Sequence, residues 1–150
     1  MSEKHMYDVQ LSWTSDRKGT MSSDVLNDSI EVATPPEFPK GMPGIWSPEH
    51  LFVASVSSCL MTTFLAIAEF SKLDYIRFNV DALGTLEKVD GKFKMSTIEL
   101  RPVIEIEDAE KEAKALRVIE KAEAACLVSN SINSEIVLKP TIKVVATAGI

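Results

Sequence analysis

The strongest constraint on the fold of this chain is a run of 18 residues, from Leu51 to Ala68, that carries no charge. A helix made of such residues has nearly its whole circumference inside the protein. Ser47 is a good N-cap, Pro48 suits the first helical position, and Glu49 complements the helix dipole. A membrane span is the alternative, but the serine and threonine residues in the run make its centre too polar. The run therefore predicts a buried central helix.

The length and composition of the chain limit what it can bind. Its 150 residues make one ordinary domain, expected to span 1–150, and 45% hydrophobic residues argue against disorder. The net charge of −6 argues against nucleic acid and against an anionic membrane surface as partners. The N-terminal sequence MSEKHMYDV has no apolar signal core, so a cytoplasmic location is expected. With two histidines and no Cys-x-x-Cys spacing, neither a metal nor a cofactor is predicted.

The residues before the central helix predict a small antiparallel sheet. Apolar and polar residues alternate in Tyr7–Trp13, as in a strand with one buried face. A turn at Ser15–Gly19, a short strand through Met21 and a strand at Ile30–Ala33 would complete a meander. The proline- and glycine-rich stretch Thr34–Trp46 is expected to be a loop that lies over the core.

The residues after the central helix predict a long β-hairpin. Ile76–Leu86 alternates between apolar and polar residues, and Asp90-Gly91 marks a tight turn. The apolar positions of Lys92–Ile106 change phase, which predicts a bulge near Ser96-Thr97. Pro102 indicates that part of this strand is an edge.

A second helix and a last strand complete the pattern. Asp108 is expected to cap the helix, and the last strand, Ile136–Val144, contains Pro140. The predicted order βββ-α-ββ-α-β gives an α+β domain, with antiparallel sheets around the buried central helix. The predicted inward stripe of the second helix is Leu116, Ile119, Ala122 and Cys126.

The two cysteines are the candidate reactive groups. Cys59 lies in the middle of the central helix, and Cys126 ends the second helix. Both could be buried packing residues, since free cysteine is among the most buried residue types. At helical spacing, however, Ser55, Thr62 and Thr63 surround Cys59 with small hydroxyl groups. These hydroxyl groups could hydrogen-bond a reacting thiolate or simply pack against strands.

Four motifs in this sequence match a known family. They are SPEHLF at residues 47–52, the Ser58-Cys59-Leu60 segment, the hairpin on Asp90-Gly91, and ACLVSN at residues 125–130. Together they resemble the OsmC/Ohr family of osmotically inducible and organic-hydroperoxide-resistance proteins, over nearly the whole chain. The resemblance implies a strand-swapped α+β homodimer and a cysteine-based peroxidase that reduces organic hydroperoxides. One departure is Leu127, because proline commonly follows the second cysteine in the family.

The resemblance also implies roles for four residues. Cys59 would be the peroxidatic nucleophile and Cys126 the resolving thiol. Arg17 would stabilise the thiolate and the developing alkoxide, and Glu49 would orient Arg17, with Lys18 as an alternative activating cation. Oxidation of Cys59 to a sulfenic acid, followed by condensation with Cys126, gives a disulfide that an external dithiol reductant must reopen.

Helical spacing indicates that the active site is shared between subunits. Glu49 and Cys59 are ten residues apart, which is about 15 Å along a helix and roughly 80° around it. Glu49 therefore cannot hold Arg17 against the Cys59 of its own helix without a long detour. We expect each site to combine Cys59 and Cys126 of one subunit with Arg17 and Glu49 of the other, across a two-fold interface.

Two other classes of function stay open. The first is a binding or redox-sensing module that keeps the OsmC-like fold without turnover. The second is a thiol-disulfide oxidoreductase, which would call for exposed cysteines close together in sequence. Consumption of a hydroperoxide with a dithiol reductant separates a peroxidase from the binding module.

Overall fold

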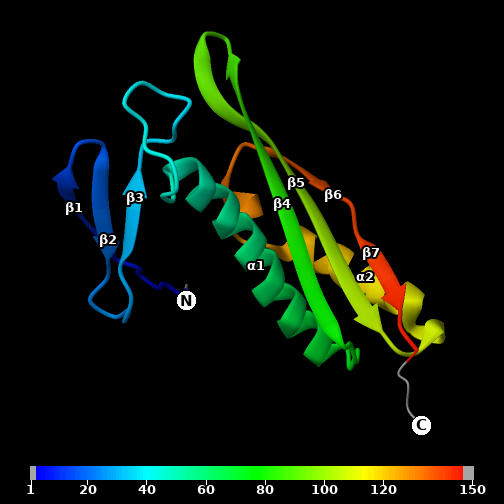
Figure 1. The fold of residues 1–150 in the computed structure, drawn as a ribbon. Coiled ribbons are helices and arrows are strands. Elements are labelled where there is room, and N and C mark those ends of the chain that lie inside the picture. The colour runs from blue at the N-terminus through cyan, green and yellow to red at the C-terminus, as the bar shows by residue number, and fades with distance from the viewer. Residues whose placement is uncertain (1–2, 147–150) are drawn as a thin grey trace. The chain divides into compact units, whose positions relative to one another are not determined.

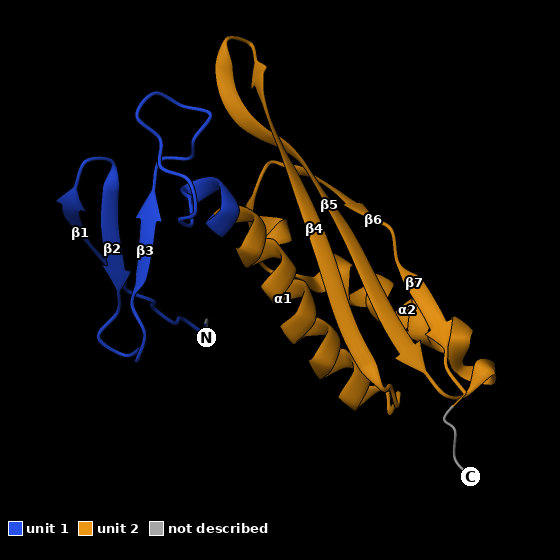
Figure 2. Cartoon of the chain, in the orientation of Figure 1, with its two compact units in different colours: residues 1–51 blue, residues 52–150 orange. Residues whose placement is uncertain are grey.

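The protein has an α+β fold, as predicted from the sequence. The computed structural model describes residues 3–146, which contain two α-helices and two β-sheets (Figure 1). The chain divides into two compact units, unit 1 with residues 1–51 and unit 2 with residues 52–150 (Figure 2). That the whole chain acts as one domain stays a prediction.

Unit 1 contains a three-stranded antiparallel sheet in the order β1-β2-β3, which confirms the predicted meander. The turn between the first two strands holds Asp16 at a positive φ of 47°. The proline-rich segment 34–46 forms no regular structure, apart from a bridge between Val32 and Trp46 at its end. The strands are β1 (Gln10–Ser15), β2 (Lys18–Ser22) and β3 (Ile30–Ala33).

The apolar side chains of the first strand are exposed. The expected burial of one face is wrong for the single chain, since Leu11 is 65% and Trp13 is 76% exposed. All six residues of β1 are exposed, so none of the described residues covers either face of the strand. An alternating pattern reports that a face is apolar, and it does not say which molecule covers that face.

The central helix α1 runs from Pro48 to Phe70 and begins as predicted. The Ser47 hydroxyl accepts the His50 N–H at 3.1 Å, and the Ser47 carbonyl accepts the N–H of Leu51 at 2.9 Å. Only one stripe of the helix is fully buried, whereas Met61 is 40% exposed. A helix this long and apolar could also span a membrane, but here its buried stripe belongs to a protein core. The buried stripe is Val56, Leu60, Phe64 and Ala68.

The hairpin of unit 2 confirms the predicted turn and bulge. Strands β4 (Arg77–Val89) and β5 (Lys92–Ile106) pair antiparallel around Asp90 and Gly91, whose φ angles are 53° and 79°. Two positive φ values are typical of a two-residue hairpin turn. The register shifts after Thr85↔Thr97 to Leu86↔Met95, so Ser96 is the extra residue of a bulge.

The end of the chain differs from the prediction in two ways. The last strand is split into β6 (Glu135–Leu138) and β7 (Thr141–Val144), and both pair with β5 in parallel. The sheet is therefore mixed, not antiparallel throughout. Both strands keep one register on β5, which brings Pro140 level with Pro102. Neither proline has an N–H to donate, so the ladder is interrupted there, and Pro102 lies in a central strand, not at an edge.

Both helices of the chain contribute to one hydrophobic core with β5. Asp108 caps the short 3-10 helix η1 (Ala109–Lys111), because its carboxylate accepts the N–H of Glu110 at 2.9 Å, and α2 (Glu112–Ala125) follows. Leu116, which we expected on the inward stripe, is 38% exposed, and Ala115 lies inward in its place. The 3-10 helix η2 (Ser129–Ser131) follows α2. The core comprises Val56, Leu60, Phe64, Ala68, Leu73, Ile98, Leu100, Ile104, Ile106, Ala115, Val118, Ile119 and Ala122.

Candidate active site

Cys59 lies in the middle of α1, beside the buried stripe and partly open to solvent. Its sulfur is 3.9 Å from the hydroxyl oxygen of Thr63, one helical turn further along. The hydroxyl of Thr62 donates instead to the backbone carbonyl of Cys59 at 3.1 Å. Thr63 is therefore one of the expected hydroxyl groups that does contact this sulfur. Ser55 instead donates to the backbone carbonyl of Phe52.

Cys126 lies at the C-cap of α2 and is fully buried. Its backbone is extended, with φ −65° and ψ 112°, so the chain leaves the helix at this residue. The Cys126 N–H still donates to the carbonyl of Glu123 at 3.2 Å. The end of the helix thus holds this thiol at a fixed place in the core.

The fold of unit 2 brings the two cysteines together. Both thiols are free, and each is among the groups that shift the pKa of the other, so the two side chains are neighbours. The two residues come from different helices, and their contact depends on both helices packing on β5. Two neighbouring free thiols are the partners that disulfide formation requires.

The surroundings of Cys59 favour its thiolate. Burial raises the pKa of Cys59, but the hydrogen bonds that its sulfur accepts outweigh burial and lower the pKa below its ordinary value. The donors, in order of effect, are the Cys126 thiol, the Val128 N–H, the Thr63 hydroxyl and the Leu127 N–H. Among the described residues of unit 2, every group that lowers this pKa is a neutral donor. That Arg17 or Lys18 also stabilises this thiolate stays a prediction.

The surroundings of Cys126 favour the protonated thiol. Burial raises the pKa of Cys126, donors on Ser129 partly oppose this, and the neighbouring Cys59 raises the pKa further. The buried hydroxyl oxygen of Ser129 has no hydrogen-bond partner of standard geometry among residues 3–146, and it approaches the Cys126 sulfur. Of the two thiols, Cys59 is therefore the one that loses its proton more readily.

Arg17 lies in the exposed turn between β1 and β2. Its carbonyl accepts the N–H of Thr34 at 3.2 Å, and its guanidinium forms no ion pair among residues 3–146. The adjacent Lys18 pairs with Glu31 at 2.9 Å. Of the two candidate cations, Arg17 is thus the one whose charge is uncommitted within the described chain.

Glu49 lies in the first turn of α1, within unit 1. One of its carboxylate oxygens is buried and has no hydrogen-bond partner among the described residues. A buried carboxylate oxygen without a donor costs free energy, and a guanidinium is a donor that would satisfy it. The association of Arg17 and Glu49 with the two cysteines stays a prediction.

A hollow of about 440 Å³ lies beside Arg17 in unit 1. Its walls are mostly apolar and include Trp13. Residues of β1, β2 and β3 supply most of this wall. The hollow is lined by Leu11, Trp13, Arg17, Lys18, Gly19, Val32, Ala33, Thr34 and Pro48.

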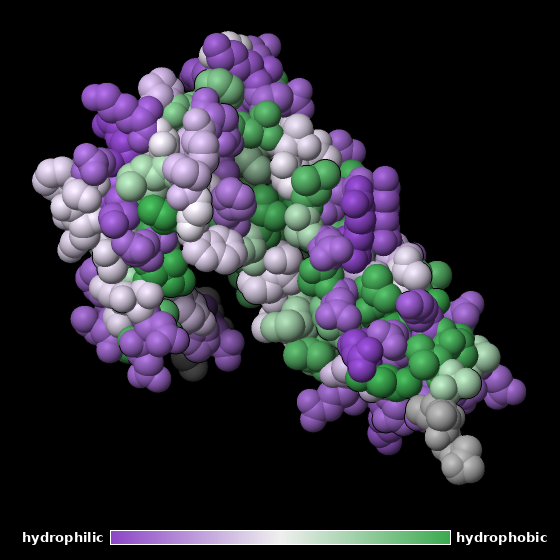
Figure 3. All heavy atoms as spheres, in the orientation of Figure 1, coloured by the Kyte–Doolittle hydropathy of each residue, from purple (hydrophilic) through white to green (hydrophobic). Residues whose placement is uncertain are grey.

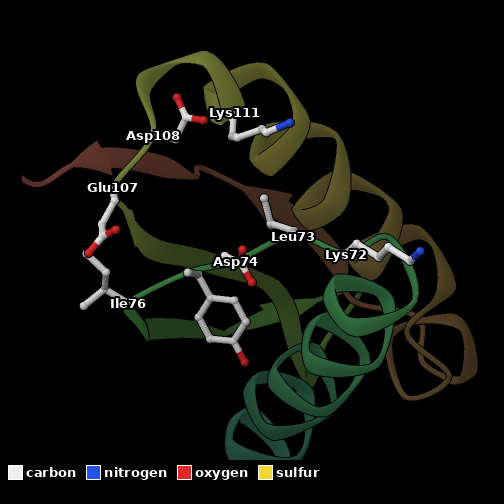
Figure 4. Close-up of a pocket in the computed structure, with 8 residues that line it drawn as sticks. Lys72, Leu73, Asp74, Ile76, Glu107, Asp108 and Lys111 are labelled. Atoms are coloured by element: carbon white, nitrogen blue, oxygen red, sulfur yellow. The ribbon is translucent and has the colours of Figure 1, made fainter.

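A different hollow lies between two connections of unit 2, one after α1 and one after β5 (Figure 4). It measures about 370 Å³, and two lysines, Lys72 and Lys111, line it together with the carboxylates of Asp74, Glu107 and Asp108. It contains no thiol and none of the four candidate site residues, Cys59, Cys126, Arg17 and Glu49. The chemistry of the chain therefore centres on the cysteines and not on this hollow.

The residues that sequence analysis missed are those of the segment after Cys126. Leu127 and Val128 act on the Cys59 sulfur through backbone N–H groups, which no side-chain pattern reveals. Ser129 was part of the ACLVSN motif, but its role beside Cys126 was not predicted. The one signal available was the absence of proline at position 127, since proline has no N–H.

Comparisons of sequence and of structure both find OsmC-like proteins. A family model described as OsmC-like protein matches residues 41–141. The uncharacterized protein YmaD of Bacillus subtilis (strain 168) is 28% identical over 153 residues, which cover 95% of this chain and 97% of that protein.

Two solved structures illustrate the similarity of fold. An OsmC-like protein of unknown function from Vibrio cholerae is 25% identical, with a TM-score of 0.79 over 93% of this chain and 99% of that chain. An organic hydroperoxide resistance protein from Elizabethkingia anophelis, with thiocyanate bound, is 26% identical, with a TM-score of 0.71 over 95% of this chain and 100% of that chain.

Proposed function

Because this chain belongs to the OsmC-like family, we propose that it is a thiol-dependent peroxidase that reduces organic hydroperoxides. The similarity to a protein named for organic hydroperoxide resistance supports this substrate class. In the proposed reaction Cys59 attacks the peroxide, Cys126 resolves the oxidised cysteine, and a dithiol restores both thiols.

The observation that carries the proposal is that two neighbouring thiols have pKa values shifted in opposite directions. Cys59 is partly open to solvent and has a lowered pKa, whereas Cys126 is buried and has a raised pKa. A nucleophile needs access and a thiolate, and a resolving thiol must stay reduced until the first has reacted. Packing alone would require neither these opposite shifts in pKa nor two neighbouring cysteines from different helices.

The proposed chemistry balances over three steps. The Cys59 thiolate attacks the terminal oxygen of the hydroperoxide and the O–O bond breaks, which gives a sulfenic acid and an alkoxide that takes up a proton from solvent. The Cys126 thiol then attacks the sulfenic sulfur, a disulfide forms, and water leaves. An external dithiol reduces this disulfide by exchange and is itself oxidised to a disulfide.

Arg17 and Glu49 are proposed to complete the site from a second copy of the chain. The uncommitted guanidinium of Arg17 would stabilise the thiolate and the developing alkoxide, and the unpaired oxygen of Glu49 would orient that guanidinium. The apolar hollow beside Arg17 would hold the organic part of the hydroperoxide.

Exposed apolar side chains support a homodimer. In unit 1 Leu11 and Trp13 are exposed on β1, and in unit 2 Met61 and Leu65 are exposed on α1. Apolar residues, in green, lie at the surface of both units among polar ones (Figure 3). Such surfaces mark protein interfaces more often than free surface.

The test is consumption of cumene hydroperoxide with a dithiol reductant. We expect Cys59→Ser to abolish consumption, and Cys126→Ser to allow one oxidation of Cys59 and then stop, with a gain of one oxygen atom detected by mass spectrometry. Ser58→Ala, next to the nucleophile and exposed, is the matched control that should keep activity. Undiminished activity in Cys59→Ser would exclude a peroxidase based on this residue. A disulfide that forms without turnover would favour the redox-sensing module instead.

A further inference from the structure

The first turn of α1 contains a serine and a histidine that are joined by two hydrogen bonds. The Ser47 hydroxyl oxygen lies 2.7 Å from Nδ1 of the His50 ring, and it also accepts the His50 N–H at 3.1 Å. In a capping box the third side chain of the helix returns to the backbone N–H of the N-cap residue. Here the third side chain, His50, returns to the N-cap hydroxyl instead.

The burial of Ser47 determines which of the two atoms carries the shared hydrogen. Ser47 is fully buried, so its hydroxyl hydrogen needs an acceptor within the protein. Within residues 3–146, Nδ1 of His50 is the acceptor that this hydroxyl meets. If Nδ1 donated instead, the hydroxyl hydrogen would be buried without a partner in this part of the chain. The neutral ring of His50 therefore accepts at Nδ1 and carries its own hydrogen on Nε2.

The His50 ring also connects the start of α1 to the sheet of unit 1. Its centroid is 6.3 Å from that of a Trp46 ring, and the two planes meet at 89°. The Trp46 carbonyl accepts the N–H of Ala33, at the end of β3, at 2.8 Å. The next residue, Thr34, donates its N–H to the Arg17 carbonyl at 3.2 Å. A series of contacts within unit 1 therefore joins the turn that carries Arg17 to the first turn of α1.

The hollow of about 440 Å³ in unit 1 is lined from both of these turns. Arg17 lines it from the turn after β1, and Pro48 lines it from the first position of α1. Glu49 follows Pro48, and one oxygen of its carboxylate is buried without a hydrogen-bond partner among the described residues. A guanidinium and a carboxylate form a strong pair only when both are held in the right geometry.

We propose that His50 is a positioning residue, which locks the first turn of α1 so that Glu49 holds Arg17 at this hollow. The inference rests on the proposed function and adds a fifth residue to its site. His50 lies nine residues before Cys59, about 13.5 Å along the helix and roughly 180° around it. His50 therefore acts through Glu49 and not on the thiol.

Two replacements separate the acceptor of His50 from its ring. His50→Phe keeps a ring beside Trp46 and leaves the Ser47 hydroxyl hydrogen buried without an acceptor. His50→Asn loses the ring, but its side-chain carbonyl oxygen takes the place of Nδ1. We expect His50→Phe to lower kcat/KM for cumene hydroperoxide on the order of tenfold, because the site loses its fixed geometry, and His50→Asn to keep most of it. His5→Phe, at the other histidine, which is exposed, is the matched control.

A second background separates positioning from a general loss of stability. In a Glu49→Gln chain the carboxylate charge is already absent, so His50→Phe should cause no further loss of activity. Losses that multiply in the double variant would mean that His50 acts independently of Glu49, and they would overturn the inference. An active His50→Phe with an inactive His50→Asn would also overturn it, since the ring and not the acceptor would then matter.

Urea unfolding tests the contact between Ser47 and His50 without a hydroperoxide. The costs of Ser47→Ala and His50→Phe should be less than additive, because the first change removes the hydroxyl that the second leaves unpaired. Strictly additive costs would overturn the inference. If the parent protein does not consume hydroperoxide, the proposed function fails and the positioning role fails with it, even where the coupling is found. If the parent is active and His50→Phe keeps its rate, only the inference about His50 fails.

Discussion

The hydroxyl of Thr63 offers a direct test of how α1 tunes its own cysteine. Its oxygen is 3.9 Å from the Cys59 sulfur and helps to lower the pKa of that thiol. Thr63→Val keeps the shape of the side chain and removes the donor. We therefore expect a higher pKa for Cys59 and, at neutral pH, alkylation slower by a factor of about two to ten. The lowered pKa means that the loss is seen below and near the pKa and vanishes at high pH.

The control for this prediction is Thr62→Val on the adjacent residue. The Thr62 hydroxyl donates to the Cys59 carbonyl and not to its sulfur. The same change in chemistry should therefore leave the pH dependence of alkylation close to that of the parent. If Thr62→Val and Thr63→Val slow alkylation equally, the effect comes from the helix and not from the contact with the sulfur.

At the scale of single residues, sequence predicts a role where the side chain carries the chemistry. Cys59 and Thr63 were predicted together because a hydroxyl one turn from a thiol lies near it on any helix. Leu127 and Val128 were not, because they act through an N–H that every residue but proline possesses. Their role depends on where the turn after α2 places them, which is a property of tertiary structure.

At the scale of elements, Gly84 marks a close approach of β4 to α1. A Cβ atom at this glycine would meet the Val53 side chain of α1 and lie 2.7 Å from the terminal methyl of Met95. We expect Gly84→Ala to lower the free energy of unfolding by about 1–3 kcal/mol through overpacking. This exceeds the stabilisation of about 0.4–1 kcal/mol that the loss of glycine flexibility in the unfolded chain would give. Urea unfolding measures the difference.

The Val53 side chain, which a Cβ atom at position 84 would meet, supplies the control. Val53→Ala alone should destabilise the protein by loss of packing, but in the Gly84→Ala background it also makes room for the new methyl group. The two changes should therefore cost less together than the sum of their separate costs. Strictly additive costs would mean that Gly84 and Val53 do not meet in solution.

Elements were predicted correctly where the signal is local. The hairpin turn at Asp90-Gly91 and the bulge at Ser96 follow from a dipeptide and from a change of phase within one strand. The parallel pairing of β6 and β7 with β5 was missed, because a strand pattern does not state the direction of its partner. The prediction that Pro102 lies at an edge was wrong for the same reason. Its missing N–H is accommodated inside the sheet because Pro140, at the same level, also has no N–H.

At the scale of the whole molecule, two features of the chain are not explained by a single copy. Within the part of the chain that the structure describes, the groups that lower the pKa of Cys59 are neutral hydrogen-bond donors, and the Arg17 guanidinium has no ion pair. The apolar residues of β1 and of α1 are exposed at the same time. A second copy that covers these apolar residues and donates its Arg17 and Glu49 would account for both features.

Mixed dimers test whether each site is shared between two copies. Cys59→Ser and Arg17→Ala chains should each have low activity alone. When they are co-expressed with different tags and purified together, one site of the mixed dimer holds both defects and the other is intact, so about half of the parental activity per dimer should return. A mixed dimer of Cys59→Ser with Cys126→Ser is the control, because both residues are placed in the same subunit's site and neither site would be whole. If each site belonged to one chain, mixing Cys59→Ser with Arg17→Ala would restore nothing, and the shared site would be excluded while the roles of the two cysteines would stand.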